Sequence, residues 1–149
     1  MQYKCNSPVL IIIFNRPHFV KNMIDILRQV EPSKIYIVAD GPRESVITDQ
    51  DKCFQAREQI DKIDWECDVH KKYSDKNLGC GINPSKGISW GFETSDELII
   101  LEDDCVPSLD FFKYCDELLD LYSNDQRIMM ISGNNHTFGQ FDFKYSYEF

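Results

Sequence analysis

The sequence has no long apolar run and no excess of positive charge. The apolar residues 9–14 are far fewer than the roughly 20 that cross a bilayer, and no other segment approaches that length, so we expect no transmembrane segment. Sixteen Lys and Arg stand against twenty-five Asp and Glu, which gives a net charge of −9. Because this charge repels polyanions, we expect no nucleic-acid partner.

The cysteines lack the close spacing of zinc and redox sites. They lie at positions 5, 53, 67, 80, 105 and 115, with no pair closer than ten residues, whereas such sites use C-x-x-C pairs. Met1 is followed by the polar residues 2–7, which are not typical of a signal peptide. We therefore expect a cytoplasmic protein with reduced thiols.

What the sequence does contain is a chain of single-domain size with an ordinary core composition. It has 149 residues, 42% of them hydrophobic, and we treat residues 1–149 as one domain. Apolar β-branched segments alternate with segments of helical spacing, which predicts an α/β fold with a mostly parallel sheet flanked by helices, and residues 8–14 as the central strand. The expected strands are residues 8–14, 35–39, 65–73, 97–101 and 128–131; the expected helices are residues 17–30, 48–63, 86–92 and 109–122, with a loop over 74–85.

Polar residues follow the expected strands at the points where the strands end. Asn15 and Arg16 follow the first strand, and Asp40 follows the second. An acidic triplet at 102–104 follows the fourth strand, and the polar residues 132–134 follow the last. Because the carboxyl ends of parallel strands share one edge, where ligands of such sheets bind, we expect the functional site there.

The triplet Glu102, Asp103 and Asp104 predicts a divalent cation. Adjacent carboxylates repel one another, and hard oxygen ligands suit Mg²⁺ or Mn²⁺. Phosphate oxygens of a ligand would complete the coordination, while Arg16 would hold phosphate in a forked geometry and Asp40 would accept hydrogen bonds from a nucleobase imide or a ribose hydroxyl. Each feature also has a simpler interpretation: a solvated acidic loop, a surface arginine and an Asp-Gly turn.

Several segments together resemble a known family in order and spacing over nearly the whole chain. These are residues 8–17, 38–41, 77–79 and 100–108, with a Phe-Phe pair at 111–112. They are similar to GT-A-fold glycosyltransferases, and most of all to the branch with the N-acetylglucosaminyltransferase that starts complex N-glycan branching and its bacterial sugar-transferase relatives. The resemblance implies a Rossmann-like fold that binds a nucleotide-sugar.

The resemblance also implies roles for particular residues. The D-x-D motif of the family corresponds to Glu102-Asp103-Asp104 here, with Asp104 as the ligand of Mn²⁺ or Mg²⁺ and with Glu102 and Asp103 near the ribose and the donor sugar. Asp40 corresponds to residues that contact uracil, and Arg16 to residues near the nucleotide and the diphosphate. The other residues that we place around the donor are Asn15, Asn77, Gly79 and Lys86.

By this resemblance the chain is a glycosyltransferase domain that binds a UDP-sugar through a divalent metal. The sugar, a hexosyl or N-acetylhexosaminyl group, is transferred to a hydroxyl of a saccharide or glycan acceptor. Family members are about twice as long as a single domain of ~100 to 150 residues, and their second half supplies the acceptor site and usually the base. We therefore expect a donor-binding half with the acceptor-binding half absent, and we identify no catalytic base.

Other interpretations of the same sequence remain open to different degrees. A non-catalytic nucleotide-sugar-binding or interaction module uses the same binding residues without turnover. A phosphoacceptor receiver domain has a similar length and alternation, but it needs acidic residues after the first strand, where this chain has Asn15 and Arg16. A nucleotidyltransferase or a flavodoxin-like carrier needs a glycine-rich phosphate loop at that point, which is also missing.

Overall fold

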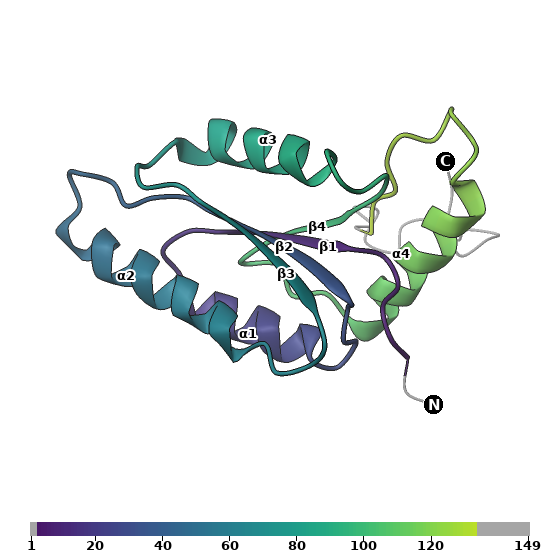
Figure 1. Ribbon diagram of the computed structural model, residues 1–149, viewed down its shortest axis with the longest axis horizontal. Coiled ribbons are helices and arrows are strands. Elements are labelled where there is room, and N and C mark those ends of the chain that lie inside the picture. The colour runs from purple at the N-terminus through teal and green to yellow at the C-terminus, as the bar shows by residue number, and fades with distance from the viewer. Residues whose placement is uncertain (1–2, 134–149) are drawn as a thin grey trace, which may run out of the picture.

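The computed structural model describes residues 3–133, and within them four strands form one parallel sheet (Figure 1). The order across the sheet is β3-β2-β1-β4, with β1 pairing in parallel with both β2 and β4. The expected parallel α/β architecture and the central position of the first strand are thus confirmed. The strands are β1 (Val9–Ile13), β2 (Lys34–Ala39), β3 (Asp68–Tyr73) and β4 (Ile99–Glu102).

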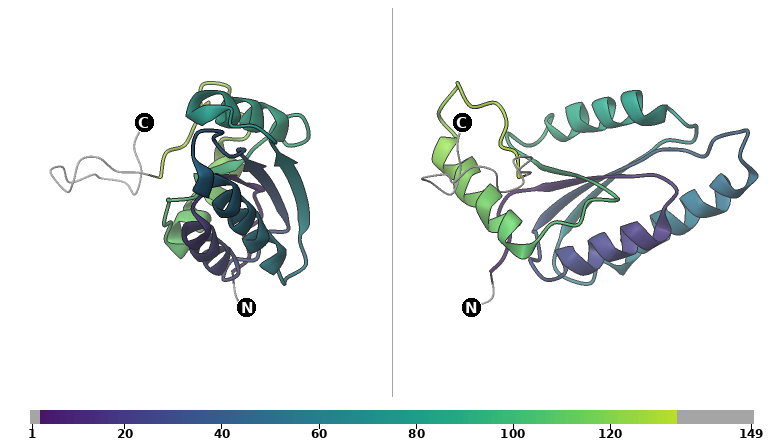
Figure 2. Two further views of the ribbon diagram at one scale, coloured as in Figure 1. Left: turned by 90° about the vertical axis from the view of Figure 1, so that its left-hand side faces the viewer. Right: turned by 180° about the vertical axis from the view of Figure 1, so that it is seen from behind.

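Helices cover both faces of this sheet, and this explains why β1 and β2 are apolar on both sides (Figure 2). In Figure 1 the helices formed by residues 17–27 and 47–58 lie below the sheet, and the helix formed by residues 79–91 lies above it. A further helix packs beside β4 and contributes Phe112 and Cys115 to the larger core cluster. The helical elements are α1 (Pro17–Leu27), α2 (Ile47–Glu58), η1 (Gln59–Lys62), α3 (Gly79–Gly91) and α4 (Leu109–Tyr122).

Small residues let α3 lie close to the sheet. A Cβ atom added at Gly87 would overlap both Cγ atoms of Val38 on β2, and one added at Gly91 would meet Leu98 and Leu10 at 2.7 and 2.8 Å. The side chains of this face form a smaller cluster of Leu10, Tyr36, Val38 and Leu98. Gly87 and Gly91 therefore serve the packing of this helix against the sheet.

Several elements differ from those predicted. The first helix ends at Leu27, and β4 spans Ile99–Glu102. Residues 79–85 belong to α3 rather than to a loop, because the helix tolerates its glycines and Pro84 once its first turn is capped from the sheet. The third strand begins at Asp68 rather than at residue 65. Residues 128–131 are not a strand, since four apolar residues alone do not distinguish a strand from an apolar coil.

The segment that was expected to be the last strand lies beside α4 instead. The amide of Ile128 donates to the carbonyl of Asp125, and the hydroxyl of Tyr114 on α4 donates to the carbonyl of Ser132. Met129 and Met130 between these anchors are 96% and 82% exposed. Within residues 3–133, the outer edge of β4 therefore has no strand partner.

Two further observations bear on the expectations from composition. None of the six cysteines, all within the described residues, takes part in a disulfide, and Cys5, Cys53 and Cys115 are buried. Across residues 3–133, each helix is too short or too polar to pass through a bilayer.

Replacing Gly87 with Ala tests the close approach of α3 to β2. The added methyl group overlaps Val38, and overpacking of this kind costs about 1–3 kcal/mol of unfolding free energy. The matched control is Gly81→Ala in the same helix, where an added Cβ meets nothing within 4 Å. Urea denaturation should show Gly87→Ala destabilised and Gly81→Ala unchanged or more stable, because Ala favours helix over Gly. Equal stability of the two variants would contradict this packing.

Candidate functional site

The carboxyl ends of β1 and β4 bring one arginine and two aspartates into direct contact. Arg16, just after β1, places Nη1 2.6 Å from Oδ2 of Asp104 and 3.2 Å from Oδ1 of Asp103. The residue is the N-cap of α1, and its carbonyl accepts hydrogen bonds from the amides of Phe19 and Val20. Its guanidinium also lies 5.9 Å from the ring centroid of Phe19. The start of α1 thus fixes the point from which the Arg16 side chain extends.

The two aspartates have different environments. Asp103 is buried, and its Oδ2 accepts the amide of Phe14 at 3.2 Å while its own amide donates to the carbonyl of Ile12. Burial raises the pKa of the Asp103 carboxyl, and the Phe14 amide and Arg16 oppose that rise. Asp104 is half exposed. Asp103 is therefore fixed in the fold, whereas Asp104 faces solvent.

The third acidic residue of the triplet is separated from the other two. Glu102 is the last residue of β4, pairs with Ile12 and is exposed. Successive strand residues point to opposite faces, so Glu102 lies on the α3 face and Asp103 on the α1 face. In the described part of the chain, no group of three His, Cys, Asp or Glu side chains is arranged to hold a metal ion.

Asp103 and Asp104 nevertheless fit part of a site for a hard divalent cation. Two carboxylates are suitable oxygen ligands for Mg²⁺ or Mn²⁺, which keep water or phosphate in their remaining positions. The guanidinium of Arg16 lies between these same oxygens. A cation that binds both aspartates therefore requires Arg16 to move.

Asp40 is buried, and its carboxylate accepts hydrogen bonds from Gly41 and from the loop of residues 77–79. Its Oδ1 accepts the amides of Gly41 and Leu78 at 2.9 and 2.8 Å, and its Oδ2 accepts the amide of Gly79 and the side-chain amide of Asn77 at 2.9 and 3.0 Å. A carboxylate has about four lone-pair sites, and these four donors use them. The predicted contact of Asp40 with a nucleobase stays a prediction that requires this loop to move.

The same bonds explain how α3 begins. The carboxylate of Asp40 accepts amides of the first turn, where a negative charge also complements the helix dipole. Gly79 has a φ of +81°, a left-handed conformation that Gly adopts without strain. Asn77 adds a second hydrogen bond to the carbonyl of Gly41 at 2.9 Å. Asp40, Asn77 and Gly79 are therefore one structural unit at the edge of β2.

A second charged unit at this edge was missed by the sequence analysis. Arg43 donates through Nε and Nη2 to Oδ2 and Oδ1 of Asp49 at 2.5 and 3.1 Å, and Asn15 donates to Oδ1 at 2.8 Å. Asp49 is almost completely buried, and its pairing with Arg43 lowers the pKa of the carboxyl to about 2. The six-residue spacing of Arg43 and Asp49 matches no motif that would have predicted their contact. The pair becomes visible only in the folded structure.

Lys86 does not join the other predicted residues. It lies seven residues after the start of α3, roughly 10 Å along the helix axis, and is exposed. Asn83 and Gly87 of the same helix face the sheet. The structure therefore brings Arg16, Asp103 and Asp104 together, joins Asp40 to Asn77 and Gly79, engages Asn15 with Asp49, and leaves Glu102 and Lys86 apart.

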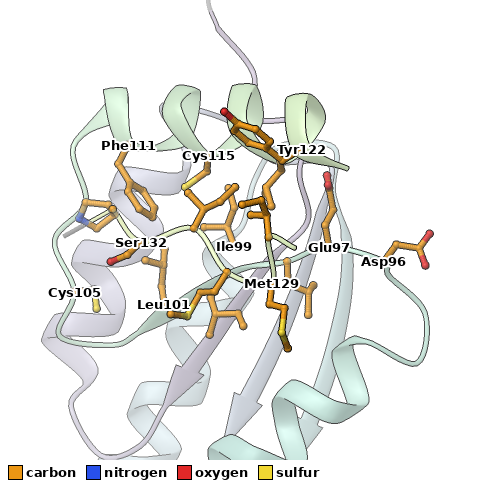
Figure 3. A pocket seen from close by; sticks show the side chains of 18 of the residues that line it. Asp96, Glu97, Ile99, Leu101, Cys105, Phe111, Cys115, Tyr122, Met129 and Ser132 are labelled. Carbon is orange, nitrogen blue, oxygen red and sulfur yellow. The ribbon is translucent and has the colours of Figure 1, made fainter. Parts of the chain in front are cut away.

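A cavity elsewhere in the fold is separate from these residues. A cavity of about 800 Å³ lies between β4, α4 and residues 128–133. Figure 3 shows its apolar walls, with Ile99 and Leu101 from β4 facing Phe111 and Cys115 from α4. It runs beside the edge of β4 that has no strand partner within residues 3–133, and its lining includes none of the predicted site residues.

Comparisons with known proteins do not add to this geometry. No family model, no curated protein and no solved structure matches the chain.

Replacing Asp40 with Asn tests the unit under α3. An Asn side chain has one acceptor oxygen and an NH₂ group that would face a donor, so charge-assisted hydrogen bonds worth about 1.5–3 kcal/mol each are lost. We expect lower stability in urea and faster hydrogen exchange of the Leu78 and Gly79 amides. The exposed Asp51 on α2 gives the control Asp51→Asn. Unchanged exchange at both amides in Asp40→Asn would contradict the capping role.

Proposed function

We propose that this chain is the donor-binding domain of a metal-dependent, GT-A-type glycosyltransferase. It binds a nucleoside-diphosphate sugar, a UDP-sugar by resemblance, at the carboxyl edge of the sheet. The observation that carries the proposal is the meeting of Arg16 with Asp103 and Asp104 at that edge. One cationic fork and two carboxylates are the complementary groups that a diphosphate with a divalent cation requires.

The sheet topology supports the same location. The connection from β1 to β2 runs through α1 on one face, and the connection from β3 to β4 runs through α3 on the opposite face. In open parallel sheets, ligands bind where the strand order reverses. That point here lies between β1 and β4, where Arg16 and Asp103 meet.

Each group has a task in this proposal. Arg16 pairs with the diphosphate oxygens, and Asp104, helped by Asp103, holds the cation. A Mn²⁺ or Mg²⁺ ion bound there would offset the charge that develops on the departing diphosphate. The loop held by Asp40 forms the neighbouring wall beside β2, where the nucleoside lies.

A second candidate, a nucleotide-sugar-binding module without turnover, is favoured by one specific observation. Three carboxylates of the described edge are already engaged: Asp40 by four donors, Asp49 by Arg43 and Asn15, and Asp103 by Arg16 and the Phe14 amide. A general base for an acceptor hydroxyl needs a free, suitably placed group. Incubation with UDP-sugars and a panel of saccharide acceptors separates the two candidates, since only the enzyme releases UDP with glycosidic product.

Ligand-induced stabilisation tests the proposed donor site. UDP with Mn²⁺ should raise the free energy of unfolding by about 2.7 kcal/mol at a hundredfold excess over the dissociation constant. EDTA should remove most of this gain, because Asp104 binds the metal, and the metal in turn binds the diphosphate of UDP. The measurement is a thermal or urea unfolding series with UDP, Mn²⁺, both, and both with EDTA. The same stabilisation in EDTA would contradict a metal bridge.

Two variants sharpen that experiment. Asp104→Asn should fold, because the side chain is half exposed, but should lose the metal-dependent part of the stabilisation. Glu117→Gln, an exposed carboxylate farther along α4, removes the same charge away from the site and should respond as the unmodified chain does. Equal loss in both variants would indicate a general charge effect.

A further inference from the structure

We infer that Arg16 is an internal cation that occupies the divalent-metal position between Asp103 and Asp104 until a diphosphate binds. This inference rests on the proposed function and adds its regulation: metal and diphosphate bind cooperatively because both draw on Arg16. The metal takes over the two carboxylates that Arg16 releases, and the diphosphate takes over Arg16.

A single nitrogen of Arg16 lies between the two carboxylates, where a bridging metal ion would bind. Nη1 of Arg16 contacts Oδ2 of Asp104 at 2.6 Å and Oδ1 of Asp103 at 3.2 Å. A cation that is bound by both carboxylates would need the same space. A divalent cation that bridges these two oxygens therefore competes with Nη1 for the same position and meets the positive charge of the guanidinium there.

The charges show why a diphosphate relieves this competition. Asp103 and Asp104 together carry two negative charges when ionised, and Arg16 balances one of them. A divalent cation added without a diphosphate meets the positive guanidinium at close range in a partly buried site, where screening by water is reduced. A diphosphate supplies further negative charge and a forked partner for Arg16.

The parts that must move are separate from the parts that must stay. The Arg16 side chain is 47% exposed, whereas its backbone is held as the N-cap of α1. Asp103 keeps its hydrogen bond from the Phe14 amide when Arg16 leaves. A rotation of one side chain is thus sufficient, and no helix or strand has to shift.

Cooperativity follows from linkage. If a diphosphate raises the affinity for the metal, the metal raises the affinity for the diphosphate by the same factor, and such factors are typically about 5- to 150-fold. Removing Arg16 removes the competition, so the metal alone binds more tightly. It also removes the phosphate partner, so the coupling between metal and nucleotide falls.

Arg16→Gln tests this with Mn²⁺ alone, by electron paramagnetic resonance of free Mn²⁺ or by calorimetry. We expect the variant to bind Mn²⁺ without nucleotide roughly tenfold more tightly than the unmodified chain, within the usual range for coupled sites. Arg28→Gln is the matched control, because Arg28 also bridges two carboxylates, Asp25 and Asp64, at the far end of α1. It should leave Mn²⁺ affinity unchanged.

A second variant, Arg16→Lys, keeps the test possible if Arg16→Gln fails to fold. Arg16→Lys keeps the positive charge but not the planar fork, so its Mn²⁺ affinity should stay near that of the unmodified chain while its UDP affinity in Mn²⁺ falls. Tenfold tighter Mn²⁺ binding by Arg16→Lys would overturn the inference. So would identical Mn²⁺ affinity in Arg16→Gln and the unmodified chain.

The titration with Mn²⁺ alone and the titration with UDP and Mn²⁺ test this inference and the proposed function separately. The Mn²⁺-only titration contains no nucleotide and tests the competition alone. Failure of the unmodified chain to bind UDP in the presence of Mn²⁺ contradicts the proposed function. Binding of UDP with Mn²⁺ by the unmodified chain, combined with no gain of Mn²⁺ affinity in Arg16→Gln, contradicts only the role of Arg16.

Discussion

Parallel pairing of β1 with β2 on one side and with β4 on the other is the constraint on which the candidate site depends. Ile12 pairs with both Val38 and Glu102, so Phe14, Asp40 and Asp104, each two residues further on, come level with one another. An antiparallel β4 would send the acidic residues to the opposite end of the sheet. The meeting of Arg16 with Asp103 follows from this register and from the start of α1 directly behind β1.

The same edge shows three ways of stabilising a buried carboxylate. Asp40 uses the amides of a helix start, Asp49 uses a forked arginine, and Asp103 uses one amide and one shared guanidinium nitrogen. A buried charge needs such partners, because its desolvation is costly. Arg43 and Arg16 are both about half exposed. Arg43 holds Asp49 through two nitrogens and Asn15 adds a third donor, whereas Arg16 offers Asp103 a single nitrogen that it shares with Asp104. Arg16 can therefore be exchanged for another cation at a smaller loss of hydrogen bonds, which is why we place ligand chemistry there.

Much of the fold could be predicted from the sequence, because buried parallel strands and one-sided helices leave strong patterns. β1 and β2 are short apolar runs, and α4 has a capping Ser108 ahead of an apolar stripe. The full length of α3 could not be predicted, since Gly79, Gly81 and Pro84 oppose helix on their own. Packing on β2 and the Asp40 cap override that local preference.

The site was predictable only in part, for related reasons. Position at a strand end pointed to Arg16, Asp103 and Asp104, and the structure brings these three together. The alternation of side chains along a strand places Glu102 on the opposite face from Asp103. The sequence also does not show that the Asp40 carboxylate accepts hydrogen bonds from residues 37 to 39 positions away. The pair of Arg43 with Asp49 carries no motif. Hydrogen bonds between distant segments are a property of the fold, which a single sequence does not display.

The most direct test of the central claim, a metal and diphosphate site between the ends of β1 and β4, is paramagnetic broadening in the ¹⁵N-labelled chain. With UDP present, small additions of Mn²⁺ should first weaken the amide signals of Phe14, Arg16 and Asp103. Signals of Ile35 and Ile99, at the amino ends of β2 and β4, should persist. Broadening that is centred elsewhere, or that is the same with and without UDP, would contradict the account.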